Sequence, residues 1–288
     1  MSRSIVRWGA VGLVAGWLVG CAPTGKLSAA DIVARNLAAR GGLDAWRKVQ
    51  TMVWNGHIES AHAPAPSMLF ELDQKRPNKT RLLISAMGER SVRVFDGSRG
   101  WKMRLSHGKP EAEPYSLPEL RSAQAGHGID GPLIDHAARG ESVTLEGVER
   151  VGERKAYHLG VHLAKGGSED VWVDAETYLD IRFDRMVDGP AGAPRRVSVT
   201  YGDYRKVEGL QIPFLVETGE GSGVSPDRMV IERVLLNAAL DDSAFENPAS
   251  THHRARTRPS IAFQGPARSA LMPGAVGSPV EDGGTSPQ

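Results

Sequence analysis

Alternation of apolar and polar residues dominates the chain and predicts a protein built mainly from β-strands. Met52, Trp54 and Ile58 recur at a period of two, the spacing of a strand with one buried face. Similar segments follow at short intervals, with glycine, proline and asparagine at the turns between them. The pattern predicts strands over 52–58, 68–73, 79–85, 89–95, 100–105, 142–151, 155–163, 169–173, 178–187, 195–204, 211–218 and 228–236. This regular spacing favours one large, strongly curved antiparallel sheet.

A helical pattern precedes the first strand. Residues 27–48 place apolar side chains near helical spacing, with Ser28 as a cap and Asp31 in the first turn. The pair Gly41–Gly42 interrupts this run, so we expect one helix to end there and a short second helix to follow. Shorter helices are predicted around 117–124 and 133–137. The fold class is therefore α+β, mostly β.

The N-terminus has the pattern of an export signal. Residues 1–7 carry two arginines and no acid, and residues 8–20 form an uncharged, mostly apolar run that is short for a membrane span. Residues 18–21 read Leu-Val-Gly-Cys, which resembles the lipobox of bacterial lipoproteins. The resemblance implies that Cys21 is the lipid-attachment residue and that the signal is cut just before it. The alternatives are an ordinary signal peptide, or a membrane helix, with a chance cysteine.

These observations predict four segments. They are a lipoprotein signal peptide over 1–20, a lipidated tether over 21–27, one domain over 28–248 and a tail over 249–288. The tail is rich in proline, glycine, serine and arginine, a composition typical of disorder. Ala22 follows the cysteine. An aspartate at this position would resemble the inner-membrane retention signal of Gram-negative lipoproteins. Its absence here therefore implies, by the same resemblance, an outer-membrane anchor facing the periplasm.

Charge and cysteine content narrow the function. Of 35 basic residues the signal holds two, which leaves 33 against 34 acidic residues in the mature chain. A chain without a basic field is not expected to bind nucleic acid. Cys21 is the only cysteine, so once it carries lipid the domain has neither a disulfide nor a thiol nucleophile.

No pattern in the sequence indicates catalysis or a metal. His158 and His162 share a strand face, but four residues along a strand separate them by about 13 Å. His127 and His136 lack the carboxylate pattern of a metal motif, and no serine lies in a GxSxG elbow. The glycine-rich segment 219–223 lies between two strands, which is typical of a hairpin loop and not of a phosphate loop. We therefore expect no enzyme activity, no metal and no cofactor.

Five segments together carry a resemblance to a known family. They read AARGGLDAW at 38–46, FDGSRGW at 95–101, GPL at 131–133, VWVDAETYL at 171–179 and DYRKVEGLQIP at 203–213. Together they resemble the bacterial outer-membrane lipoprotein-sorting superfamily, the fold of the Lol carrier and its anchored receptor. The resemblance spans 28–248. It implies a curved antiparallel half-barrel of about eleven strands, closed by a few helices around an apolar cavity that holds acyl chains.

One loop departs from the anchored receptor. The resemblance to the anchored receptor implies a protruding loop with an apolar tip between early strands. The corresponding residues here, 61–67, form a short segment rich in proline. Delivery of lipoproteins is therefore less well supported than the binding of lipid in general.

The large apolar residues of the strands are candidates for the cavity. Each could equally be ordinary core, and only as a set do they indicate a pocket. They are Trp54, Met68, Phe70, Leu83, Trp101, Met103, Trp172, Phe183 and Phe214. We expect an anchored periplasmic lipoprotein that binds lipid or the acyl chains of an acylated protein. The alternative is an anchored sensor or scaffold that binds an envelope protein partner through the half-barrel, without lipid transport.

Overall fold

The computed structural model describes residues 26–251, apart from 62, 64, 106–110, 190–192 and 221–224. The predicted signal peptide, the lipid-attachment residue Cys21 and the predicted tail therefore lie outside the described residues. Within the part of the chain that is described, no helix has the length and apolar character needed to span a bilayer.

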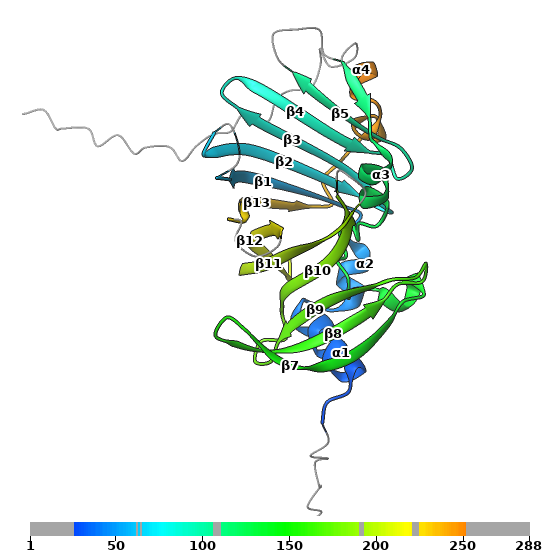
Figure 1. Cartoon of the computed structure of the whole chain (residues 1–288), viewed down its shortest axis with the longest axis vertical. Coiled ribbons are helices and arrows are strands. Elements are labelled where there is room, and N and C mark those ends of the chain that lie inside the picture. The colour runs from blue at the N-terminus through cyan, green and yellow to red at the C-terminus, as the bar shows by residue number, and fades with distance from the viewer. Residues whose placement is uncertain are drawn as a thin grey trace, which may run out of the picture. The chain divides into compact units, whose positions relative to one another are not determined.

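One antiparallel sheet of 13 strands organises the described residues (Figure 1). Its spatial order is β6-β5-β4-β3-β2-β1-β13-β12-β11-β10-β9-β8-β7. The first and last strands therefore pair at its middle, and β6 and β7 are the two edge strands. The strands are β1 Thr51–Glu59, β2 Ser67–Lys75, β3 Lys79–Ala86, β4 Glu89–Phe95, β5 Gly100–Leu105, β6 Ala112–Pro114, β7 Ser142–Val151, β8 Arg154–His162, β9 Ser168–Asp174, β10 Asp180–Asp188, β11 Pro194–Val207, β12 Leu210–Glu220 and β13 Asp227–Leu236. The curved, unclosed sheet confirms the predicted fold class, with two differences. The sheet has more strands than the eleven that the resemblance implied, and β10 begins at Asp180 because Tyr178 has a φ of 58°.

The helices begin and end largely where the sequence predicts. They are α1 Ala29–Ala39, α2 Leu43–Lys48, α3 Leu117–Gln124, the 3₁₀ helices η1 His136–Arg139 and η2 Asp242–Phe245, and α4 Pro248–Thr251. Ser28 and Asp31 form a capping box at the start of α1. After α1 the chain turns through Gly41, whose φ is 109° and where a Cβ would lie 2.7 Å from the Gly209 carbonyl oxygen. The predicted helix around 133–137 is wrong at its start, because buried turns occupy 133–135 before η1.

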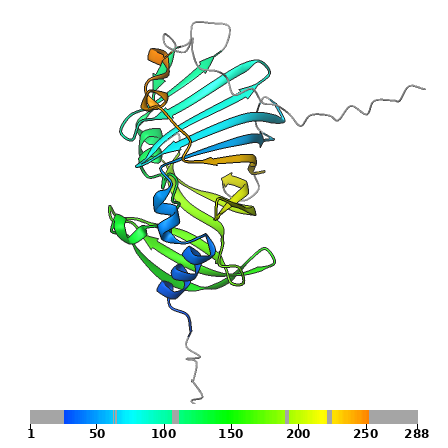
Figure 2. The same cartoon turned by 180° about the vertical axis from the view of Figure 1, so that it is seen from behind.

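The helices α1 and α2 pack against one face of the sheet, hereafter the helix-covered face (Figure 2). Ile32 of α1 is fully buried against side chains of β8, β9 and β10. Trp46 of α2 packs against Leu210 and Ile212 at the start of β12. On the opposite face, Phe245 of η2 is fully buried against strand β4. Burial of these large side chains is the main stabilising contribution of the helices.

Buried polar contacts fix α1 against β10. Arg40 Nη1 donates to Asp180 Oδ2 at 2.9 Å, and Asn36 Nδ2 donates to Asp180 Oδ1 at 2.9 Å. The Arg40 guanidinium also lies 4.5 Å from the centre of the Trp46 ring. Burial raises the pKa of Asp180, and the charge of Arg40 opposes that shift. The first helix is thus attached to the sheet by a paired charge as well as by apolar packing.

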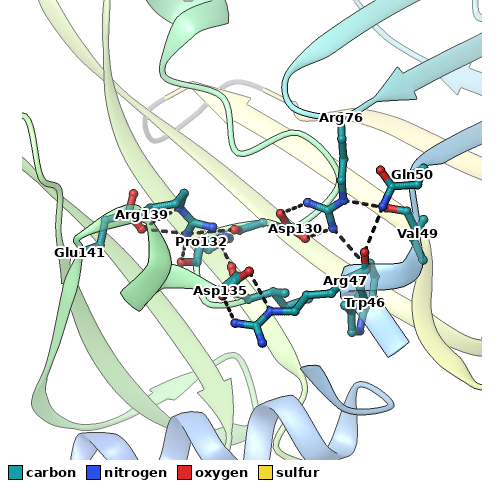
Figure 3. Close-up of polar contacts among 12 residues, drawn as sticks. Trp46, Arg47, Val49, Gln50, Arg76, Asp130, Pro132, Asp135, Arg139 and Glu141 are labelled. Carbon is teal, nitrogen blue, oxygen red and sulfur yellow. Dashed lines mark hydrogen bonds and ion pairs between the residues drawn. The ribbon is translucent and has the colours of Figure 1, made fainter. Parts of the chain in front are cut away.

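Three arginines fix the segment 126–141, which follows α3 (Figure 3). Arg76 forms an ion pair with Asp130 and donates to the Trp46 and Val49 carbonyls at the end of α2. Arg47 pairs with Asp135 at 2.7 Å, while Arg139 donates to carbonyl oxygens within the segment itself. This network holds the connection between α3 and β7 over the helix-covered face.

Candidate functional site

A cleft of about 750 Å³ lies between α3, strands β4 and β5, and the facing ends of β10 and β11. Four cations line it: Arg93, Lys102, Arg185 and Arg195. Strand pairing places it on the helix-covered face. Arg93 is opposite Leu82, which packs with the α2 cluster, and Arg185 is on the same face of β10 as Phe183, which packs with α1. The cleft thus joins strands from distant parts of the sheet.

Part of the cleft lining is less polar. It is formed by Tyr115, Pro118, Ala123 and Val187. Gly100 makes room for the Tyr115 ring, because a Cβ at that glycine would lie 2.1 Å from the ring. The cleft therefore has apolar side chains among its cations, which suits a ligand that has both characters.

Helix α3 covers the cleft and is held by charge instead of burial. None of its residues is buried, and Leu117 at its start is 70% exposed. Glu119 accepts from Arg93 at 2.9 Å and from Lys102 at 3.2 Å, and Arg121 pairs with Asp188 of β10 at 2.6 Å. These ion pairs connect α3 to both sides of the cleft.

Glu119 has the strongest electrostatic role in α3. Burial acts to raise the pKa of its carboxyl, but hydrogen bonds from Ser116 and from the two cations outweigh that effect and lower the pKa to about 2. The carboxylate is therefore charged over the whole physiological pH range. It also completes the capping box of α3 with Ser116.

The stabilisation of the folded state by Glu119 should be lost in acid. Because its folded-state pKa lies below the ordinary value of about 4.3, the stabilisation is complete above that value and is lost as the pH falls toward 2. We expect Glu119→Gln to lower the free energy of unfolding by about 1–2 kcal/mol at neutral pH and by less at pH 2. Urea unfolding across this range measures the difference, and parallel pH profiles for the two proteins would contradict it.

A second, smaller cleft of about 220 Å³ adjoins the first, since the two share several lining residues. Arg121 of α3, Glu169 of β9 and the same Arg185 line it. Glu169 is buried and hydrogen-bonds His127, whose ring packs edge-on against Phe183. Arg185 is thus common to both clefts.

The histidines singled out in the sequence have separate partners. His158 stacks on Trp172 at 4.5 Å and contacts Glu149 and Asp170, whereas His162 contacts Thr144. Among the described residues, no three metal-ligating side chains gather as they would around an ion.

Comparisons with known proteins bear on the fold. No protein-family profile and no curated protein matches the sequence. A DUF1329 family protein from Desulfovibrio piger is similar in structure, with a TM-score of 0.50 and 13% identity over 77% of this chain and 98% of that one. A putative outer membrane lipoprotein-sorting protein domain from Vibrio parahaemolyticus has a TM-score of 0.49 and 10% identity over 75% and 94% of the two chains. A LolA superfamily protein from Nitrosomonas europaea has a TM-score of 0.49 and 11% identity over 77% of this chain and 98% of that one.

The chain shares the fold of the DUF1329 family protein. Its curved, unclosed antiparallel sheet with few helices confirms the half-barrel architecture that the sequence resemblance implied. At these levels of identity the likeness concerns the fold alone. None of the three proteins is named as an enzyme.

Within the sheet, the nine predicted cavity residues separate onto two faces. Trp54, Met68, Phe70, Phe183 and Phe214 are on the helix-covered face, packed in its two clusters. Leu83 and Trp101 pack with Phe245 on the opposite face, where strand pairing also places Met103 and Trp172. None of the nine lines the cleft beneath α3. A ligand-binding role for them remains a prediction.

The residues that line the cleft were not predicted as a site. Arg93, Lys102, Arg185 and Arg195 occupy strand positions that read as ordinary solvent-facing residues. The one signal in the sequence is the interruption of the strand pattern at 115–140, which places a helix where the half-barrel is open.

Proposed function

We propose that this protein is a membrane-anchored envelope lipoprotein that binds a lipid, or the acyl chain of a lipoprotein, for transfer or localisation and without catalysis. The observation that carries the proposal is the cleft beneath α3 on the helix-covered face of the half-barrel. Its volume of about 750 Å³ falls within the range of ligand pockets. The resemblance of five sequence segments to the lipoprotein-sorting superfamily supports the same proposal.

The lining of the cleft favours an amphiphile. Pro118, Ala123 and Val187 offer apolar contact for part of a chain, and each methylene removed from water contributes about 0.8 kcal/mol. The four cations of the lining would leave a purely apolar ligand in an unfavourable contact. A chain with a polar headgroup satisfies both the cations and the apolar side chains of the lining.

A bulky substitution in the cleft tests this proposal. Val187 lines the cleft, so Val187→Trp should weaken binding of a fluorescent fatty-acid analogue at least tenfold, while Val148→Trp, at an exposed position of β7, should leave it unchanged. Fluorescence titration measures both affinities. Equal affinities of the wild type and the two variants would contradict binding in this cleft.

The proposed anchor is Cys21. Cys21→Ser should abolish incorporation of labelled fatty acid and release the protein from membranes. Unchanged retention in the membrane fraction would contradict lipid anchoring. This experiment is independent of the ligand in the cleft.

A second candidate function is that of an anchored sensor or scaffold for an envelope protein. It is favoured by two exposed apolar side chains, Leu69 at 64% and Met87 at 82%. Leu69 is paired with Ser85, two residues before Met87, so both are at one end of strands β2 and β3. Under this alternative, a pull-down from envelope extracts recovers a partner with the wild type and not with a variant carrying Leu69→Ser and Met87→Ser.

A further inference from the structure

We infer that the cleft contains an anion-binding site centred on Arg185, which takes the phosphate or carboxylate headgroup of the bound amphiphile. The inference rests on the proposed function and deepens it by naming the class of ligand. It starts from the charges that line the cleft and from the partners that each of them has.

The cleft has an excess of positive charge. Four cations line it against two carboxylates, Glu119 and Asp188. Each carboxylate is already engaged, Glu119 with Arg93 and Lys102, and Asp188 with Arg121. The cations that line the cleft therefore exceed the carboxylates available there to neutralise them.

Arg185 has no compensating partner among the described residues. It is half-buried, and no hydrogen bond or ion pair joins it to any residue of the described ranges. The carboxylate beside it on β9, Glu169, hydrogen-bonds His127 instead. A partly desolvated guanidinium without a counter-charge is unfavourable, so an anion that entered the cleft would gain from pairing with it.

The position of Arg185 suits a headgroup. It lines both the large cleft and the smaller one, so it lies where the two adjoin. Val187 is two residues along β10 on the same face and offers apolar contact beside it. The guanidinium can donate two parallel hydrogen bonds to a phosphate or a carboxylate. A chain that packs against Val187 can thus place its anionic end at Arg185.

Matched ligands separate the headgroup from the chain. We would titrate the full-length protein with dodecanoate, dodecyl phosphate, dodecanol and inorganic phosphate. The wild type should bind the two anionic amphiphiles at least about tenfold more tightly than dodecanol. Arg185→Gln should remove that preference and leave the affinity for dodecanol unchanged, while Arg185→Lys should retain most of it.

Arg233→Gln is the matched control. Arg233 is an exposed arginine of β13 on the opposite face of the sheet, so its loss changes the net charge equally without touching the cleft. It should leave the preference for anions unaltered. Circular dichroism of each variant establishes that it is folded.

The outcomes distinguish the two proposals. Binding of dodecanol and the anions with equal affinity, or a preference that survives Arg185→Gln, would overturn the anion site and leave the proposed function standing. Failure of all three amphiphiles to bind would overturn the proposed function. Inorganic phosphate that binds alone and is lost in Arg185→Gln would support the anion site without an acyl chain.

Discussion

Replacing Asp180 by alanine is expected to destabilise the protein by about 3–5 kcal/mol, because the substitution leaves Arg40 buried without a counter-charge. The side chains of this pair are only 8% and 5% exposed, and their closest atoms are 2.9 Å apart. Asn36 would lose its hydrogen bond to the same carboxylate. Urea unfolding monitored by circular dichroism gives the free-energy change.

Two comparisons separate the missing charge from other effects. The double variant Arg40→Met and Asp180→Leu replaces the pair by apolar side chains and should recover most of the loss. Asp203→Asn removes the charge of a surface pair with Arg205, tolerates the φ of 48° at this position, and should cost less than about 1 kcal/mol. A loss below 1 kcal/mol for Asp180→Ala would show that α1 does not depend on the buried ion pair.

Replacing Phe245 by alanine should lower the free energy of unfolding by about 3–5 kcal/mol. The ring is fully buried against Val92 and Val94, on the face of the sheet that α1 and α2 leave uncovered. Truncation removes this apolar contact and leaves a cavity under η2. Urea unfolding provides the measurement.

A conservative replacement controls for position. Phe245→Leu keeps most of the apolar volume and should cost clearly less than the alanine variant. If both substitutions cost the same small amount, η2 contributes little to the fold and the cluster around β4 is stable without it.

The sequence predicted the positions of the strands better than it predicted which face of each strand the helices cover. Period-two alternation located every strand except β6, whose three residues are too few to show a period. Alternation separates the two faces of a strand but does not say which face the helices cover. Leu82, Leu83 and Ile84 are apolar in succession, so only the structure shows that Leu83 faces Phe245 and its two neighbours face the α2 cluster.

The cleft depends on long-range arrangement. Arg93 and Arg185 are far apart in the sequence and in the order of strands, and only the curved sheet with α3 between its parts makes them line one cleft. The ion pairs of Glu119 and Arg121 that hold α3 there are likewise contacts between distant elements. No local pattern of residues records such contacts, so sequence reasoning did not predict this mixed, cationic cleft.

Native mass spectrometry tests the central claim most directly. A Cys21→Ser variant, exported to the periplasm by an ordinary secretion signal and purified without detergent, would be measured with and without Val187→Trp. The account predicts a co-purifying mass of an anionic lipid or fatty acid, which the second substitution removes. A clean apo mass for the unblocked cleft, or a lipid that persists after Val187→Trp, would contradict it.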